Sequence, residues 1–239
     1  MDEQPLPSTS EVLGLLRAQA DTGNVAGMAR YGISSSGTLG VSIPFLRNIE
    51  KTTRAARRAR PGDAHALAAD LWASGIHEAR ILASMLDVPT LVTREQADAW
   101  AADLDSWDVC DGLCNNLLDK TRIAYELATE WATAAPEFVK RAGFVLMCMR
   151  ALHDRTAGDE TFLGFLALVE READDERPFV KKAINWALRQ IGKRNGYLHA
   201  AAVEVGVRLR DSGSKAARWV ASDALRELTD ERTIARLGR

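Results

Sequence analysis

A helix predicted over residues 106–118 carries an aromatic ring and a carboxylate on the side that does not face the core. Its apolar positions follow the 3.6-residue spacing of a buried helix face, and they are Val109, Cys110, Leu113 and Leu117. Trp107 and Asp111 are four residues apart, so they lie one above the other on the polar side. A carboxylate there can stabilise a developing positive charge, and an indole can pack against a sugar or base. This helix is the first candidate for chemistry.

Two other predicted helices present cations. In the helix 43–58 the basic residues step by four, three and four positions, and they are Arg47, Lys51, Arg54 and Arg58. Such a stripe is either a solvated face or a row of phosphate contacts. In the helix 177–193, Trp186 lies off the core stripe, with Lys182 four residues before it and Arg189 three after. The ring is either covered by the stems of these cations or available to nucleic acid.

The helix 135–152 places Lys140 and Arg141 away from its apolar stripe, which consists of Phe138, Ala142, Val145, Leu146 and Met149. We expect both cations to point away from the core, where solvation and phosphate binding are equally consistent with them. The segment His77-Glu78-Ala79-Arg80 is interpreted as structural, because it does not complete a HExxH motif. Core positions are predicted for three tryptophans and three reduced thiols: Trp72, Trp100, Trp131, Cys110, Cys114 and Cys148.

The composition of the 239-residue chain is typical of an all-α protein, with 46% hydrophobic residues and few β-branched runs. The net charge of −2 is unevenly distributed: segments 47–60 and 177–218 are basic and segment 95–130 is acidic, which suits a polyanion-binding face. No apolar run approaches the ~20 residues of a membrane span. The acidic start lacks a signal-peptide core, and no His stands at ligand spacing from the cysteines. We therefore expect a cytoplasmic protein without a metal or other cofactor.

Prolines, caps and periodicity predict a chain of short helices joined mostly by loops of two to six residues. They are expected at 8–21, 24–30, 43–58, 63–74, 76–86, 93–103, 106–118, 120–130, 135–152, 160–171, 177–193, 196–210 and 213–228. Helix pairs at intervals of roughly 35–45 residues are typical of HEAT-like repeats. We predict a curved α-solenoid in a single domain over 1–239, monomeric, with 1–7 flexible. Its concave face is expected to be lined by 43–58, 106–118, 135–152 and 177–193.

Three motifs, in this order, resemble the AlkD-like DNA alkylation repair proteins over about residues 25–195. They are Leu71-Trp72-x-Ser74-x-x-His77-Glu78-x-Arg80-x-Leu82-Ala83, Trp107-Asp108-x-Cys110-Asp111 and Phe179-Val180-x-Lys182-Ala183-Ile184-x-Trp186-x-Leu188-Arg189. This family consists of HEAT-like-repeat glycosylases that remove cationic N3- and N7-alkylated purines. The resemblance implies a monofunctional DNA glycosylase acting in base excision repair. Its partner would be double-stranded DNA that contains alkylated bases.

The resemblance also implies roles for individual residues. Asp111 matches the catalytic carboxylate, Trp107 and Trp186 the aromatic pair that holds the lesion nucleotide's backbone, and Arg141 a cation on the phosphate. Tyr31 matches a family tyrosine by its distance before Pro44. The family's aromatic-rich segment between those positions is replaced here by Ser34-Ser35-Ser36-Gly37-Thr38, which bears on substrate range and activity.

Two alternatives stay open at the level of the sequence. The altered segment 34–38 is compatible with a non-catalytic relative that binds bent or branched DNA. Solenoids also serve as protein-interaction scaffolds, for which the basic stripe would have no role on DNA.

Overall fold

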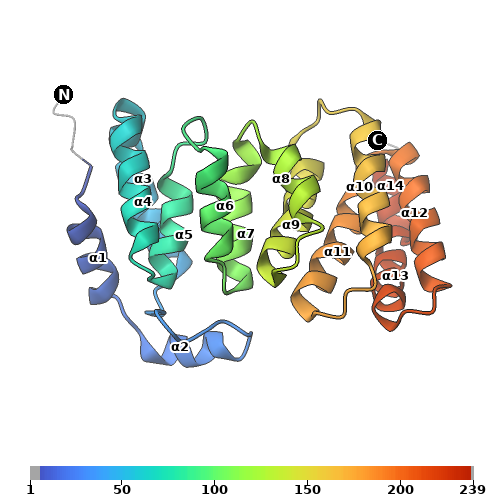
Figure 1. Cartoon of the computed structure of the whole chain (residues 1–239), viewed down its shortest axis with the longest axis horizontal. Helices are drawn as coiled ribbons and strands as arrows, with labels where there is room; N and C mark the ends of the chain where they lie inside the picture. Colours follow the sequence, from blue (N-terminus) through green and yellow to red (C-terminus); the bar gives the residue numbers. More distant parts are fainter. Residues whose placement is uncertain (1–5, 238–239) are drawn as a thin grey trace. The chain divides into compact units, whose positions relative to one another are not determined.

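The computed structural model describes residues 6–237, and the regular structure within that range is helical (Figure 1). The all-α prediction is confirmed. Of the segment predicted to be flexible, residues 1–5 lie outside the described residues. The helices are α1 (Thr9–Ala18), α2 (Thr22–Ala29), α3 (Ile43–Ala59), α4 (Pro61–Ala73), α5 (His77–Leu86), α6 (Arg94–Ala102), α7 (Trp107–Asn116), the short 3₁₀ helix η1 (Leu118–Lys120), α8 (Ala124–Trp131), α9 (Glu137–His153), α10 (Asp159–Glu172), α11 (Pro178–Ile191), α12 (Gly196–Arg210), α13 (Lys215–Leu228) and α14 (Glu231–Leu237).

Several helix boundaries coincide with capping residues and prolines in the sequence. Ser8 caps α1 in a capping box with Glu11, and Pro61 and Pro178 occupy the first positions of α4 and α11. The prediction misplaced the junction after α7, which ends at Asn116 and is followed by η1. There the hydroxyl of Thr121 bonds to the carbonyl of Leu118 instead of continuing a helix. The short helix α14 was not predicted.

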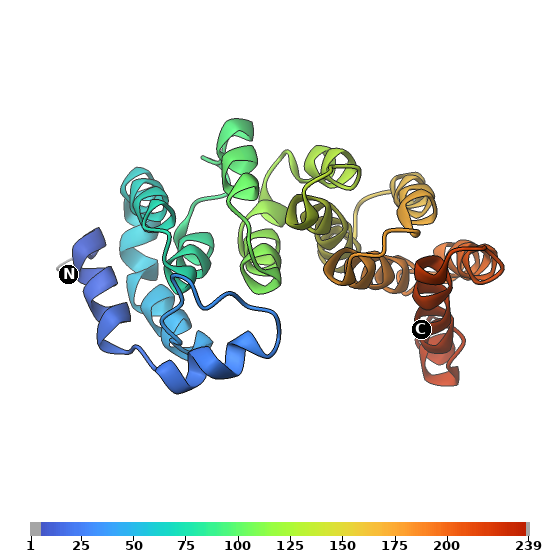
Figure 2. The ribbon, with the colours of Figure 1, turned by 60° about the horizontal axis from the view of Figure 1, so that its bottom comes forward.

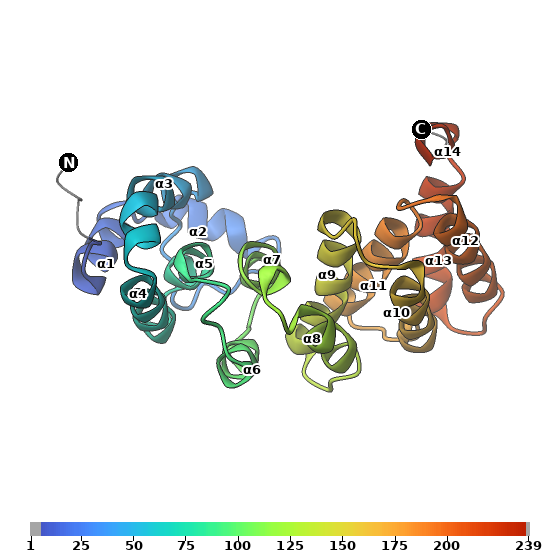
Figure 3. The same ribbon diagram turned by 90° about the horizontal axis from the view of Figure 1, so that it is seen from above.

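The chain divides into two compact units, Met1–Arg122 and Ile123–Arg239. In the first unit, α5 packs against α3, α4 and α7. Figure 3 shows α3, α5 and α7 in one layer, with α4 and α6 in the other. The rings of Trp72 and Trp100 stack at 4.2 Å and join α4 to α6. Both tryptophans are buried, as predicted. The layer of α3, α5 and α7 therefore lies over an apolar core, and its middle helix α5 is buried on most of its surface.

The second unit repeats this arrangement. The helices α9, α11 and α13 pack in one row, and α8, α10 and α12 cover them (Figures 2 and 3). Gly143 permits the close packing of α9 on α8, because a Cβ there would stand 2.3 Å from the backbone nitrogen of Ala132. Within each unit, the helices predicted to line one face share a layer. In the part of the chain that the structure describes, no helix is both long and apolar enough to cross a membrane.

Candidate functional site

The helix α7 has the two faces that its sequence predicts. Its apolar positions, together with Leu117 just after its end, are buried, and they are Val109, Cys110, Leu113 and Leu117. Trp107 and Asp111 are half-buried on the other side. The carboxylate of Asp111 thus lies one helical turn from an indole, at a position that solvent reaches.

Trp107 is joined to another predicted residue, Tyr31, although 76 positions separate them in the sequence. The indole Nε1 donates a hydrogen bond of 3.0 Å to the backbone carbonyl of Tyr31. This contact fixes the indole at the start of α7. Tyr31 is 73% exposed. The structure therefore places Tyr31, Trp107 and Asp111 in the same part of the first unit.

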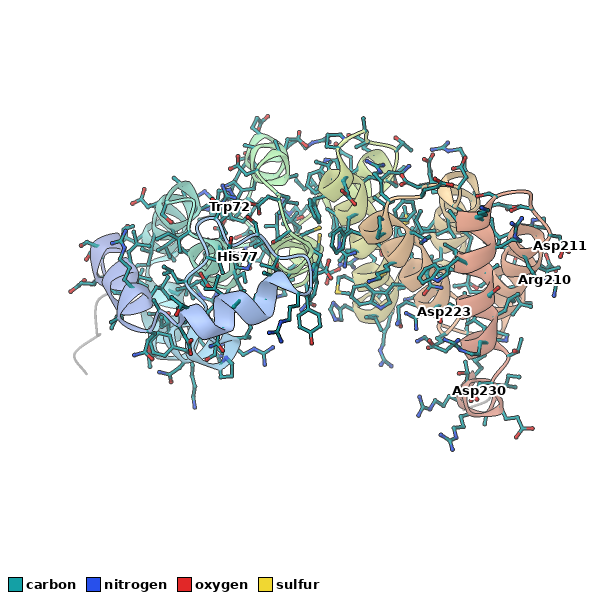
Figure 4. All side chains as sticks on the ribbon, turned by 90° about the horizontal axis from the view of Figure 1, so that it is seen from below. Trp72, His77, Arg210, Asp211, Asp223 and Asp230 are labelled. Atoms are coloured by element: carbon teal, nitrogen blue, oxygen red, sulfur yellow. The ribbon has the colours of Figure 1, made fainter. Side chains whose placement is uncertain are left out.

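Asp108 has a structural role at the start of α7. Its carboxylate accepts from Ser106 Oγ at 2.8 Å and pairs with His77 Nε2 at 2.8 Å. Burial opposes the charge on each member of this pair. For Asp108 the contact with His77 outweighs that burial and lowers the pKa, and for His77 the contact with Asp108 outweighs it and raises the pKa. The pair fixes α7 to α5 next to the labelled His77 in Figure 4.

Glu78 orders the loop that runs before α3. Its side chain is buried and accepts hydrogen bonds from the backbone nitrogens of residues 39–41, with the shortest, 2.6 Å, from Gly40. Gly40 has a φ of +81°, and a Cβ there would stand 2.2 Å from the carbonyl oxygen of Asp21. The structural interpretation of the segment 77–80 is confirmed. The serine-rich segment 34–38 is part of this ordered loop, and its residues 34–37 are exposed.

The predicted stripe on α3 is exposed at all four positions: Arg47, Lys51, Arg54 and Arg58. Arg54 is paired with Glu50, from which its Nη2 lies 2.9 Å away. The other three side chains make no hydrogen bond or ion pair within residues 6–237. A cavity of about 660 Å³ opens beside this stripe, along α3 and at the C-terminal ends of α5 and α7. Arg57 and Lys120 add to its basic lining.

In the second unit the placement of Arg141 differs from the prediction. Arg141 is 6% exposed and Lys140 is 8% exposed, so the expectation that both point away from the core is wrong. The reason is that α9 packs against both α8 and α11, which cover nearly all of its surface. Arg141 Nη1 donates to the carbonyl of Phe179 at 2.6 Å. Lys140 pairs with Glu172 at 2.8 Å and with Asp175 at 2.9 Å.

The cations around Trp186 are in different environments. Trp186 is half-buried. In the orientation of the Gln190 amide that satisfies its hydrogen bonds, the amide oxygen accepts from Trp186 Nε1 at 3.0 Å. Lys182 is exposed and makes no ion pair with the described residues. Arg189 is bound to Glu227 of α13. Lys182 is therefore the predicted cation of α11 that remains available for a ligand.

The basic segment 177–218 is less basic as a surface than as a sequence. Half of its ten cations form ion pairs: Arg177 with Asp175, Arg189 and Lys193 with Glu227, Arg208 with Glu170, and Arg210 with Asp211. Figure 4 labels the pair Arg210 and Asp211. This pairing reduces the positive charge that the segment presents, and the prediction of a polyanion-binding face stays a prediction. The acidic partners of these five come from neighbouring turns and helices, several of them outside the segment.

Residues 12–228 match the model of a protein family described as DNA alkylation repair enzyme. The chain belongs to this family. No curated protein sequence is similar enough to match. The fold is also similar to a solved structure from a group described as "a new family of proteins related to the HEAT-like repeat DNA glycosylases with affinity for branched DNA structures". The identity is 20%, the TM-score is 0.78, and the match covers 97% of each chain. The HEAT-like repeat fold predicted from the sequence is confirmed.

Several features of this DNA alkylation repair family member were missed by sequence reasoning. Trp219 of α13 is 41% exposed, and Lys181 Nζ lies 4.9 Å from its ring centroid. The signal was present, because Lys215, Arg218, Trp219 and Ser222 recur at helical spacing. The grouping of Lys120 with the α3 stripe had no local signal. Among the described residues, no group of three or more His, Cys, Asp or Glu is placed to hold a metal ion.

Proposed function

We propose that this protein is a DNA glycosylase that hydrolyses the N-glycosidic bond of cationic N3- or N7-alkylated purines in duplex DNA. The observation that carries the proposal is the position of Asp111, one turn from Trp107 on the solvent side of α7, in a chain of the DNA alkylation repair enzyme family. Asp108, the other carboxylate of this helix, pairs with His77 and has a structural role. We assign catalysis to Asp111 because it shares the polar side of α7 with Trp107 and matches the catalytic carboxylate of the family.

The chemistry needs few groups from the protein. An alkylated purine already carries a positive charge, so it leaves without a general acid. As the bond breaks, positive charge develops on the deoxyribose, and a nearby carboxylate stabilises it electrostatically and orients the attacking water. In this proposal Asp111 supplies that carboxylate. The indole of Trp107 packs against the sugar and adds its negative π-face to the same stabilisation.

The contacts of Trp107 support its positioning role. Because its Nε1 is bonded to the carbonyl of Tyr31, the ring is held in one orientation before DNA arrives. The exposed ring of Tyr31 extends the aromatic surface on this side of the first unit. The three unpaired cations of α3, Arg47, Lys51 and Arg58, would bind phosphates of the same duplex. Arg54 would join them on release from Glu50.

The second unit contributes its own candidates for backbone contact. Trp186 and Lys182 of α11 are accessible, whereas Arg189 would have to leave Glu227 to reach a phosphate. Arg141 is proposed as a phosphate contact from the family resemblance, and its burial against Phe179 makes it the least accessible of the group.

The test of the glycosylase proposal is Asp111→Asn, which keeps the shape of the side chain and removes its charge. We expect base release from methylated duplex DNA to fall by about 10²-fold or more, with DNA binding retained. The assay measures free 7-methylguanine and binding by fluorescence anisotropy. Asp105→Asn, at an exposed carboxylate just before α7, is the matched control and should release base at the wild-type rate. Full activity of Asp111→Asn would contradict the mechanism.

A second candidate is a protein that binds branched DNA without releasing a base. Two observations favour it: the small exposed side chains of residues 34–37 in place of aromatic ones, and the branched-DNA affinity ascribed to the structural relative. This alternative predicts that the wild-type protein binds DNA in a salt-dependent way and releases no base. The base-release assay on the wild type therefore decides between the two.

A further inference from the structure

The basic cavity of the first unit has a shape that the stripe on α3 alone does not explain. It is an open cavity lined by α3 from Arg47 to Arg58, by the end of α5 with the turn after it, and by the end of α7 with η1. Its cations come from two elements: five from α3, which are the four of the stripe and Arg57, and Lys120 from η1. A helix face that only follows a duplex backbone does not need a further cation from a second element beside it.

The lining carries a strong excess of positive charge. Its cations are Arg47, Lys51, Arg54, Arg57, Arg58 and Lys120, and its carboxylates are Glu50 and Asp87. Both carboxylates are engaged: Glu50 by Arg54 and Arg57, and Asp87 by His65 at 2.6 Å and Gln96 at 2.7 Å. The excess of four positive charges therefore remains after every acidic group of the lining is counted.

Two cations of this cluster, Arg57 and Lys120, have a structural role. Arg57 donates to the carbonyl of Met85 and Lys120 to that of Asn116, so each satisfies the C-terminal end of a helix. Arg47, Lys51 and Arg58 make no such hydrogen bond to the described residues. Burial lowers the pKa of Lys120; Asp119 and Glu50 oppose this, and the charge of Arg57 lowers the pKa further. An anion in the cavity would relieve that electrostatic cost.

The size and the remaining walls of the cavity indicate more than a free ion. A volume of about 660 Å³ is in the range of small-molecule sites and exceeds what one phosphate fills. Met85, Val88, Pro89 and Pro61 supply apolar surface next to the cations. Such walls suit a sugar or base attached to the phosphate.

We propose that this cavity binds the phosphorylated end of a DNA strand, with the terminal phosphate between the α3 cations and Lys120. An internal phosphodiester carries one negative charge and is esterified on both sides, so a linear stripe is sufficient for it. A terminal phosphomonoester carries ≈ 1.5 to 2 negative charges and three accepting oxygens, which cations from two elements can satisfy. The inference rests on the proposed binding of DNA and adds a preference for strand ends.

The test compares three duplexes of one sequence: intact, nicked with a 5′-phosphate, and nicked with a 5′-hydroxyl. Binding is measured by fluorescence anisotropy at fixed salt. We expect the phosphorylated nick to bind about tenfold more tightly than the hydroxyl nick. Lys120→Gln should remove this preference while changing intact-duplex affinity by less than about twofold, because Lys120 is not on the α3 stripe. Lys120→Arg should restore it, and Lys215→Gln, an exposed lysine of α13, should leave it unchanged.

The outcomes separate this inference from the proposed function. Equal affinity for the two nicks, with intact-duplex binding and base release preserved, would overturn the cavity proposal alone. A preference that persists in Lys120→Gln would also overturn it, by assigning the phosphate to another part of the surface. Absence of binding to every duplex would overturn both proposals. Weaker binding of Lys120→Gln to all three duplexes alike would show a general electrostatic contribution and contradict the end preference.

Discussion

The two units differ in how many of their basic residues are paired with carboxylates. On α3 of the first unit, Arg47, Lys51 and Arg58 have no acidic partner among the described residues. In the second unit, Arg189 of α11, Lys193 just after α11 and Arg208 of α12 are held by two glutamates from other helices, Glu227 and Glu170. Although both segments read as basic, only the first retains its charge as a row available to a polyanion.

This difference shows that a run of basic residues in a sequence does not reveal their acidic partners, which can lie far away in the chain. The acidic partner of Arg189 is 38 positions away and that of Lys193 is 34 positions away, and both are the same carboxylate. Exposed ion pairs of this kind contribute little to stability, with a median of about 0–1 kcal/mol. Their main effect is to reduce the positive potential of the surface. The first unit is therefore the stronger candidate for the electrostatic part of DNA binding.

The largest effect should come from neutralising the free cations of the first unit. The variant Arg47→Gln/Lys51→Gln/Arg58→Gln removes up to three phosphate contacts. We expect the slope of log Kobs against log salt to become shallower by up to ~2.7, with a marked loss of duplex affinity at low salt. Anisotropy titrations between 50 and 200 mM salt measure both quantities.

The matched control removes one pair of the second unit, as Arg208→Gln/Glu170→Gln. Because this pair is already neutral as a unit, its loss should leave the salt slope within the experimental error. If the control changed the slope as much as the triple variant, the contrast between the two units would be wrong.

The sequence was sufficient for what depends on local periodicity. The core stripes of the helices 106–118 and 177–193 were predicted because apolar positions at 3.6-residue spacing can only be buried on one face. It was misleading for Arg141, because burial there depends on α9 packing against both α8 and α11. The anchoring of the loop by Glu78 and the position of Lys120 beside α3 depend likewise on contacts between distant segments. Only the folded chain shows such contacts.

The pH dependence of folding stability should differ between the two units, and the expected effect is of intermediate size. His77 has its pKa raised above 6.5 by Asp108 despite burial, so the pair stabilises the fold fully below pH 6.5 and less as pH rises through the raised value. Asp108 has its pKa lowered below 3.8, so the same contribution is lost as pH falls through that lower value. The pair therefore contributes most between about pH 3.8 and 6.5. In the second unit, Arg177 and Lys140 outweigh the effect of burial and hold the pKa of Asp175 far below its usual range.

We therefore expect stability to decline between pH 6 and 9 in the wild type and to stay level over that range in His77→Gln. The variant should lose roughly 1.5–3 kcal/mol at pH 5, the usual value of a hydrogen bond to a charged group. Urea denaturation at a series of pH values measures this. Asp175→Asn serves as the comparison, because its partners Lys140 and Arg177 do not titrate near neutral pH, and its loss of stability should be constant from pH 6 to 9. An unchanged decline in His77→Gln would assign the pH dependence to another group.

The smallest effect is a gain of affinity in the second unit. Glu227→Gln would release both Arg189 and Lys193 from their shared carboxylate and let them reach a phosphate. We expect duplex affinity to rise by about two- to fivefold at low salt and the salt slope to steepen by about 1. Glu160→Gln, at an exposed glutamate of α10, changes the net charge equally without releasing a cation from an ion pair. An equal gain in both variants would mean that only the net charge matters. A gain confined to Glu227→Gln would show that intramolecular ion pairs prevent the basic residues of the second unit from binding DNA.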